Sequence, residues 1–186
     1  MKGIKSYNHN EREKIVQKLI PLIKDKFREN FVALAADGSF ARGEDVDYSD
    51  LELIVFVHKI PKDTNWNIGK IIDGLLIEIV VETKKSYIKK YLDISDVWYA
   101  SGTGGLFPIV NKYFIDEINT FQPANVEIKT LKQIQKKWNS FQEITAKLLN
   151  NIKQNNKDGI ALIFSDMFNE LLVLLAYLNR KPYKTL

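Results

Sequence analysis

The hydrophobic and polar positions of the N-terminal part of the chain alternate between a helical spacing and short apolar runs. Apolar residues recur at helical spacing over Glu11–Asn30, which predicts a helix with Asn10 as its N-cap. Lys84–Leu92 also reads as a helix, and a short helix could run from Ser39 to Arg42. Runs rich in branched residues predict strands at 31–36, 50–57, 68–72, 75–81 and 106–110. The pattern therefore predicts an α+β fold, in which helices flank a mixed sheet of about five strands.

The pattern changes after Pro123, where only helical spacing remains. One long helix is predicted over Val126–Asn156, and a second, more apolar helix over Ile160–Asn179. We therefore expect two domains, with the mixed sheet in residues 1–122 and a helical, bundle-like domain in residues 123–186.

Composition removes several kinds of chemistry. The chain of 186 residues has no cysteine and only two histidines. This excludes a disulfide scaffold and a thiolate metal site, and it argues against a histidine-based zinc site or a Ser-His triad. Carboxylate oxygens must then carry any metal chemistry, and they suit magnesium. The net charge of +4 favours phosphate-bearing ligands but is too small to predict a nucleic-acid partner.

The sequence predicts neither a targeting segment nor a membrane helix. The N-terminal residues are polar and charged, so they lack the apolar core of a signal peptide. The longest apolar stretches, Leu75–Val81 and Leu171–Leu178, are shorter than the roughly 20 residues that a membrane helix needs. We therefore expect a cytoplasmic protein with no membrane partner.

The stretch after the first predicted strand contains residues suited to binding phosphate. The strand ends at Asp37, and Gly38 allows the backbone to approach a ligand closely. Ser39 adds a hydroxyl at the start of a short helix, where free amides can bind an anion. Arg42 follows one turn later and can reach the same anion. These residues predict a phosphate-binding loop.

Three acidic residues follow on the predicted strands. Asp50 and Glu52 are two positions apart, so their side chains point to one face of a strand, where they repel each other unless a cation lies between them. Glu78 lies in a very apolar strand, where an unpaired carboxylate is costly and is expected to face a ligand, a metal or a cationic partner. Glu82 has the same parity but ends the strand. The set predicts a magnesium site that binds nucleotide phosphates.

The order of these residues resembles the nucleotidyltransferase superfamily that shares its palm-like fold with DNA polymerase beta. Its signature is Gly-Ser, a gap, two acids separated by one residue, and a third acid on a neighbouring strand. The chain matches that signature with Gly38-Ser39, Asp50, Glu52 and Glu78. Within the superfamily the chain is most similar to the kanamycin nucleotidyltransferases, which also have glutamate as the second acid. The likeness extends over residues 10–115.

The resemblance implies a nucleotidyltransferase-type sheet and an enzyme. Such an enzyme transfers a nucleoside monophosphate from an NTP, here expected to be ATP, to a hydroxyl of a small molecule such as an aminoglycoside antibiotic. Gly38 and Ser39 would hold the triphosphate, and Arg42 would neutralise its charge. The catalytic acids would be Asp50, Glu52 and Glu78, all three of them Mg²⁺ ligands, with Glu78 near the acceptor. The resemblance also implies a homodimer, in which part of the second C-terminal helix is covered.

The predicted C-terminal helices depart from that family. The kanamycin enzymes have a carboxylate general base on the first of these helices, whereas residues 129–157 here contain seven lysines and one acid, Glu143. Glu143 is therefore the remaining candidate for the base, and the lysines favour a neutral or anionic acceptor. Two other functions stay open. The basic helix would suit transfer to a protein or RNA, and a missing base would suit nucleotide binding without catalysis, although the intact acids argue against that last reading.

Overall fold

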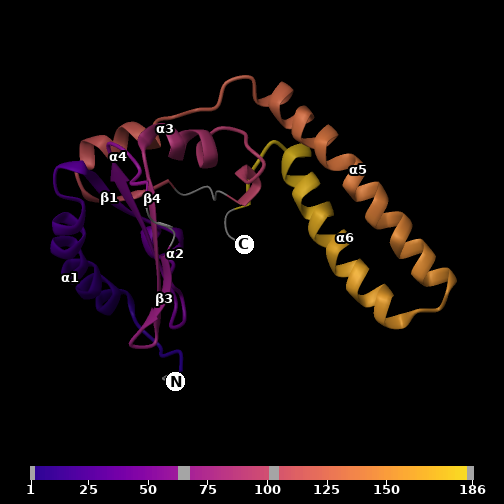
Figure 1. Cartoon of the computed structure of the whole chain (residues 1–186), viewed down its shortest axis with the longest axis horizontal. Helices are drawn as coiled ribbons and strands as arrows, with labels where there is room; N and C mark the ends of the chain where they lie inside the picture. The colour runs from indigo at the N-terminus through magenta and orange to yellow at the C-terminus, as the bar shows by residue number, and fades with distance from the viewer. Residues whose placement is uncertain (1–2, 63–67, 101–104, 184–186) are drawn as a thin grey trace. The chain divides into compact units, whose positions relative to one another are not determined.

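A five-stranded mixed sheet forms the centre of the first of two units in this computed structural model, which describes residues 3–62, 68–100 and 105–183 (Figure 1). The first unit contains the described residues up to 89 and residues 105–122. The second contains residues 90–100 and 123–183. The fold is therefore α+β, with helices that flank the sheet and a separate helical unit.

The sheet has the strand order β3-β4-β2-β1-β5. Its strands are β1 (Phe31–Asp37), β2 (Leu51–Val57), β3 (Ile68–Ile72), β4 (Leu75–Glu82) and β5 (Phe107–Val110). The pair β2 and β4 is parallel, and the other three pairs are antiparallel. Asp73 and Gly74, which join β3 to β4, both have positive φ, as a two-residue hairpin turn requires.

Helices cover both faces of this sheet. The first unit contains α1 (His9–Phe27), α2 (Gly38–Ala41), α3 (Lys84–Tyr87) and α4 (Lys112–Asn119), with a 3₁₀ turn over Arg28–Asn30. Val16 of α1 packs with the buried Leu51, Leu53 and Val55 of β2 in one core. Alternate residues of β2 face the other way, where the Phe56 ring contacts Tyr87 of α3 and Phe114 of α4.

Several element boundaries differ from the sequence prediction. Helix α1 begins earlier, because Asn8 rather than Asn10 is its N-cap and forms a capping box with Glu11. The predicted helix over 84–92 is α3 followed by a π-helical turn at Ile88–Leu92. Helix α4 was not predicted. The predicted loop at 101–105 lies outside the described residues except for Gly105.

The second unit is a helical hairpin together with a short segment from the middle of the chain. Its helices α5 (Val126–Lys153) and α6 (Lys157–Leu178) lie antiparallel. Residues 90–100, which include a 3₁₀ turn at Trp98–Ala100, pack on this hairpin. The Trp98 ring stacks on Tyr177, with centroids 5.9 Å apart, and the Tyr177 hydroxyl donates to the Ser95 carbonyl at 2.7 Å. The sequence division at residue 122 had placed this segment with the sheet.

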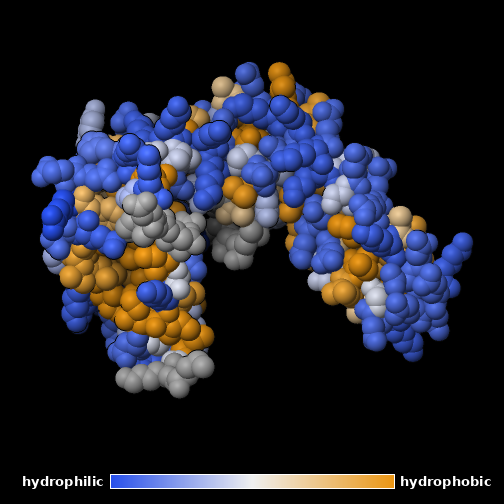
Figure 2. All heavy atoms as spheres, in the orientation of Figure 1, coloured by the Kyte–Doolittle hydropathy of each residue, from blue (hydrophilic) through white to orange (hydrophobic). Residues whose placement is uncertain are grey.

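Helix α6 exposes an apolar stripe along one side (Figure 2). The stripe consists of Phe164, Phe168, Leu171, Leu175 and Leu178. These positions are separated alternately by four and three residues, which is the heptad spacing of helices that pack against another helix. Phe164 and Phe168 are about half exposed, at 53% and 49%. Among the described residues, this side of α6 stays largely exposed, and its spacing suits packing against a further helix.

Among the described residues, α6 alone is long and apolar enough, by length and composition, to cross a membrane. Only 17% of its most apolar window is buried. Asp166 and Glu170 lie within the helix, however, and an aspartate at the centre of a bilayer costs about 2.5–3.5 kcal/mol. Glu170 also lies 3.8 Å from Lys137 of α5. These polar contacts favour α6 as one half of the helical hairpin.

We expect a second copy of the chain to cover this stripe, as the sequence resemblance implied. Phe168→Lys would place a charge in the stripe and should convert a dimer into a monomer in light scattering at micromolar concentration. Ser165→Lys is the matched control, because Ser165 is exposed on α6 but lies outside the stripe. A wild-type protein that is monomeric at this concentration contradicts the prediction.

Candidate functional site

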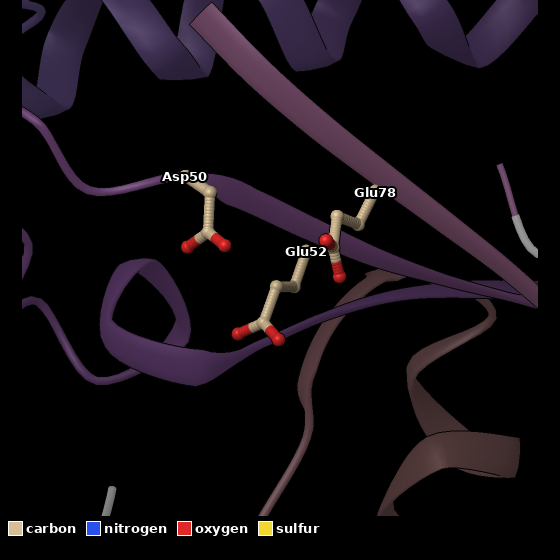
Figure 3. Close-up of side chains that lie close together, drawn as sticks. All are labelled: Asp50, Glu52 and Glu78. Atoms are coloured by element: carbon tan, nitrogen blue, oxygen red, sulfur yellow. The ribbon is translucent and has the colours of Figure 1, made fainter. Parts of the chain in front are cut away.

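The structure brings Asp50, Glu52 and Glu78 together at one end of the sheet (Figure 3). Each offers a carboxylate oxygen, and these oxygens all lie within 4.8 Å of one another. Asp50 immediately precedes β2, Glu52 is the second residue of β2, and Glu78 is directly opposite Glu52 in the parallel ladder with β4. The register of this one pair of strands therefore creates the cluster.

The alternation of β2 decides which face carries the acids. Leu51 and Leu53 are fully buried in the core that includes α1. Glu52 must then point to the opposite face, because successive side chains of a strand alternate. Figure 3 shows the Glu52 and Glu78 side chains on the same side of the two neighbouring strands. The apolar packing of α1 thus forces the carboxylates out of the core.

Crowding of negative charge changes the titration of Glu52. Burial, followed by the charges of Asp50, Asp37 and Glu78, raises the pKa of Glu52 from 4.5 to about 7. A divalent cation would reverse this effect, since it stabilises the ionised form of each carboxylate. The three oxygen donors suit magnesium by ligand type, and their mutual repulsion leaves a cation as the natural occupant.

Asp37 is a fourth carboxylate near this cluster and was not predicted as a site residue. It is the register partner of Glu52 in the antiparallel pair β1 and β2. Burial raises the pKa of Asp37, although the Gly38 amide, Arg42 and Tyr87 act in the opposite direction. Its position before Gly-Ser at the end of an apolar strand was visible in the sequence. Its proximity to Glu52 depends on the register, which was not.

The short helix of the predicted phosphate loop begins one residue earlier than expected and ends at Ala41. Helix α2 starts at Gly38, not at Ser39, and its N-cap is Asp37, whose carboxylate accepts the Gly38 amide at 2.7 Å. The Gly38 amide is therefore already occupied, and the free amides of the turn begin at Ser39. Gly38 itself has φ of +69°, and a Cβ built there would lie 1.8 Å from Glu52 Oε2. The positive φ therefore favours glycine, and a side chain at position 38 would displace the Glu52 carboxylate.

Arg42 follows α2 and lies close to the acids, but its guanidinium is not a metal-binding group. Its positive charge lowers the pKa of both Asp37 and Glu52, against the larger effect of burial. Its Nε donates to Glu44 Oε2 at 2.9 Å. An anion at this loop would therefore share the guanidinium with Glu44.

Arg12 of α1 is a second residue that the sequence reading missed. Its side chain is fully buried, and its five N–H groups make six contacts of hydrogen-bond length, so one hydrogen is shared between two acceptors; the acceptors belong to Tyr7 and to the loop that joins α2 to β2. Its acceptors are the carbonyls of Tyr7, Val46, Asp47 and Ser49 and the carboxylate of Asp45. In the sequence Arg12 lies between charged neighbours and resembles a solvated helix position.

Glu143, the candidate base, lies on α5 in the helical unit. Its side chain is exposed, and its hydrogen bond with Lys147 at 2.6 Å lowers the pKa of Glu143. A lowered pKa makes it a weaker proton acceptor. Four of the seven lysines in the basic stretch lie within 4 Å of an acid: Lys129, Lys136, Lys137 and Lys147. The argument for a neutral or anionic acceptor therefore loses much of its support.

No protein-family model and no curated protein matches the chain. The geometry of the site combines three converging carboxylates, a tight Gly-Ser turn in contact with one of them, and an arginine whose charge acts on the same group. Such a set can bind a divalent cation together with an anionic ligand.

Replacement of Gly38 by alanine should displace Glu52. Gly38→Ala and Gly43→Ala both place alanine at a positive φ, which costs roughly 1–2 kcal/mol. Only at Gly38 would the new Cβ also collide with Glu52, because nothing lies within 4 Å of a Cβ at Gly43. Chemical denaturation should show a larger loss for Gly38→Ala, and calorimetry should show weakened Mn²⁺ binding in that variant alone. Equal effects of the two variants would contradict this reading.

Glu52 should make a destabilising contribution to the metal-free protein that grows as the pH rises from about 4.5 to 7. Because the pKa of Glu52 is raised to about 7 in the fold, the folded state retains a proton that the unfolded state loses near 4.5. Glu52→Gln should therefore raise Tm at pH 8. Because Glu52 is partly exposed, solvent screening reduces the expected gain in the free energy of unfolding to about 1 kcal/mol, which corresponds to a rise in Tm of roughly 2–4 °C. Glu29→Gln, at an exposed position of the first unit, is the control and should leave the pH profile unchanged.

Proposed function

We propose that the protein is a magnesium-dependent nucleotidyltransferase, which moves a nucleoside monophosphate from an NTP to a hydroxyl of a small-molecule acceptor. The observation that carries the proposal is the convergence of Asp50, Glu52 and Glu78 beside the Gly38-Ser39 turn. ATP is the expected donor. The proposal includes the nucleotidyltransferase type of fold, since the acids lie on the central parallel pair of a mixed sheet.

This chemistry suits a site built from carboxylates, a turn and an arginine. Displacement at a phosphorus depends on positioning and charge neutralisation more than on covalent help from the protein. Asp50, Glu52 and Glu78 would hold Mg²⁺, which supplies a positive charge beside the reacting phosphate. Ser39 and Arg42 would bind the other phosphates. The cytoplasm, which supplies nucleotide and magnesium, is the expected location.

The acceptor and the base are less constrained than the donor site. Glu143 stays the candidate base, although its pairing with Lys147 makes it a weak one. The basic surface that favoured a protein or RNA acceptor is largely paired with acids. A small hydroxyl compound is therefore the acceptor we propose, with an aminoglycoside as the first compound to test.

Asp50→Asn should abolish both metal-dependent ATP binding and nucleotidyl transfer. The substitution removes one ligand and one negative charge but keeps the size of the side chain, so circular dichroism should show an intact fold, and Tm should rise because repulsion is relieved. The assay follows α-labelled ATP, GTP, CTP and UTP with magnesium, with kanamycin or a cell lysate as acceptor. Asp47→Asn, on the exposed side of the same loop, is the matched control and should remain active.

Each outcome of this assay discriminates between functions. A labelled small molecule supports the proposal, and a labelled protein or RNA supports the alternative acceptor. Magnesium-dependent ATP binding without any transfer supports a binding module. Unchanged ATP affinity in Asp50→Asn refutes the role given to that residue.

A further inference from the structure

Asp50 differs from the other two acids in how its position is fixed. Glu52 and Glu78 lie within β2 and β4, where ladder hydrogen bonds set their places. Asp50 precedes β2 and is the last residue of the loop of residues 42–50, so the sheet ladder does not hold it directly. On its C-terminal side Asp50 is held by the bond to Leu51, which pairs with Ile77 in the ladder, so a contact on the preceding peptide would fix the rest of its position.

Arg12 makes that contact through the peptide bond that precedes Asp50. The Ser49 carbonyl, which belongs to this peptide, accepts from Arg12 Nη2 at 2.7 Å and from Nε at 3.2 Å. Because the peptide is planar, two donors on one carbonyl also orient the amide and the Cα of Asp50. We propose that Arg12 is a positioning residue of the metal site, and that it presents Asp50 to the cation. This inference rests on the proposed function.

The rest of the guanidinium binds Tyr7 and other parts of the same loop. Its Nη1 donates to the Tyr7 carbonyl at 2.7 Å and to Asp45 Oδ2 at 2.9 Å, and Nη2 also reaches the carbonyls of Val46 and Asp47. Arg12 is 0% exposed and the Asp45 side chain 1%. A buried charge of this kind is tolerated only when its donors are satisfied. A loop path that moved these carbonyls away from Arg12 would remove acceptors from buried donors.

The variant Arg12→Lys tests whether Arg12 acts by positioning Asp50 or only through its positive charge. Arg12→Lys keeps the positive charge beside Asp45 but replaces the planar fork with a single ammonium, which cannot bind the Ser49 carbonyl twice while holding the other acceptors. We expect the variant to fold and its dissociation constant for Mn²⁺, measured by electron paramagnetic resonance of the free ion, to rise about tenfold or more. ATP binding in the presence of a chelator should be unchanged. The magnesium concentration for half-maximal transfer should rise, while the rate at saturating magnesium recovers.

Val16→Ala is the matched control for stability. Val16 is buried on the same helix, one turn after Arg12, and packs in the core without touching the loop in any described contact. Its replacement should lower Tm and leave Mn²⁺ affinity unchanged. If Val16→Ala weakens Mn²⁺ binding as much as Arg12→Lys does, loss of stability explains the effect and the inference is overturned.

The remaining outcomes separate this inference from the proposed function. If Arg12→Lys binds Mn²⁺ as the wild type does while Asp50→Asn does not, the metal site is real and Arg12 has no positioning role. If the wild type binds neither Mn²⁺ nor magnesium-ATP, the proposed function and the inference both fail. A selective loss of Mn²⁺ affinity in Arg12→Lys supports both.

Discussion

The pairing of β2 with β1 on one side and with β4 on the other concentrates negative charge at one end of the sheet. Asp37 and Glu78 are both register partners of Glu52, and Asp50 lies just before the same strand. A change of rotamer could not move these carboxylates far apart, because the backbone hydrogen bonds of the sheet fix the backbone positions of Asp37, Glu52 and Glu78. Burial raises the pKa of both Glu52 and Asp37, and the neighbouring carboxylates raise the pKa of Glu52 further. A bound cation would relieve this repulsion, and the oxygen donors of the three acids fit one.

A small polar network holds the surrounding loop against that repulsion. Asp45 accepts from Arg12 at 2.9 Å and lies 2.6 Å from His9 Nδ1, and the His9 ring stacks on Phe40 of α2 with centroids 4.7 Å apart. One buried carboxylate thus links α1, the loop before β2 and the helix that contains Ser39. Such networks are stable only when every member is satisfied, so they favour a single arrangement. The Gly38-Ser39 turn and Asp50, which precedes β2, are therefore linked to the same set of contacts.

The residues predicted from the sequence and those found only in the structure differ in a physical way. The sequence was enough to predict the three acids Asp50, Glu52 and Glu78. The alternation along a strand and an apolar background are local properties, and the order of the acids matches the signature of the family that the chain resembles. Arg12 and Asp37 could not be predicted in this way, since their roles depend on contacts between residues distant in the sequence. The same reason explains the segment at 90–100. Its assignment to the helices follows from the stacking of Trp98 on Tyr177, which no local pattern predicts.

The lysines of α5 also give a weaker positive surface in the structure than their number in the sequence suggests. Counted along the chain, α5 is a basic helix, which suggests repulsion of a cationic acceptor. In the fold, Lys129 and Lys136 are paired with Asp93 and Asp96 of the segment at 90–100, and Lys137 lies beside Glu170 of α6. Exposed pairs of this kind add little stability, but they cancel the field that unpaired lysines would project. The sign of the acceptor's charge is therefore not set by the composition of α5. It depends on which side chains an acceptor contacts, so a cationic aminoglycoside and a neutral polyol are equally informative compounds to compare.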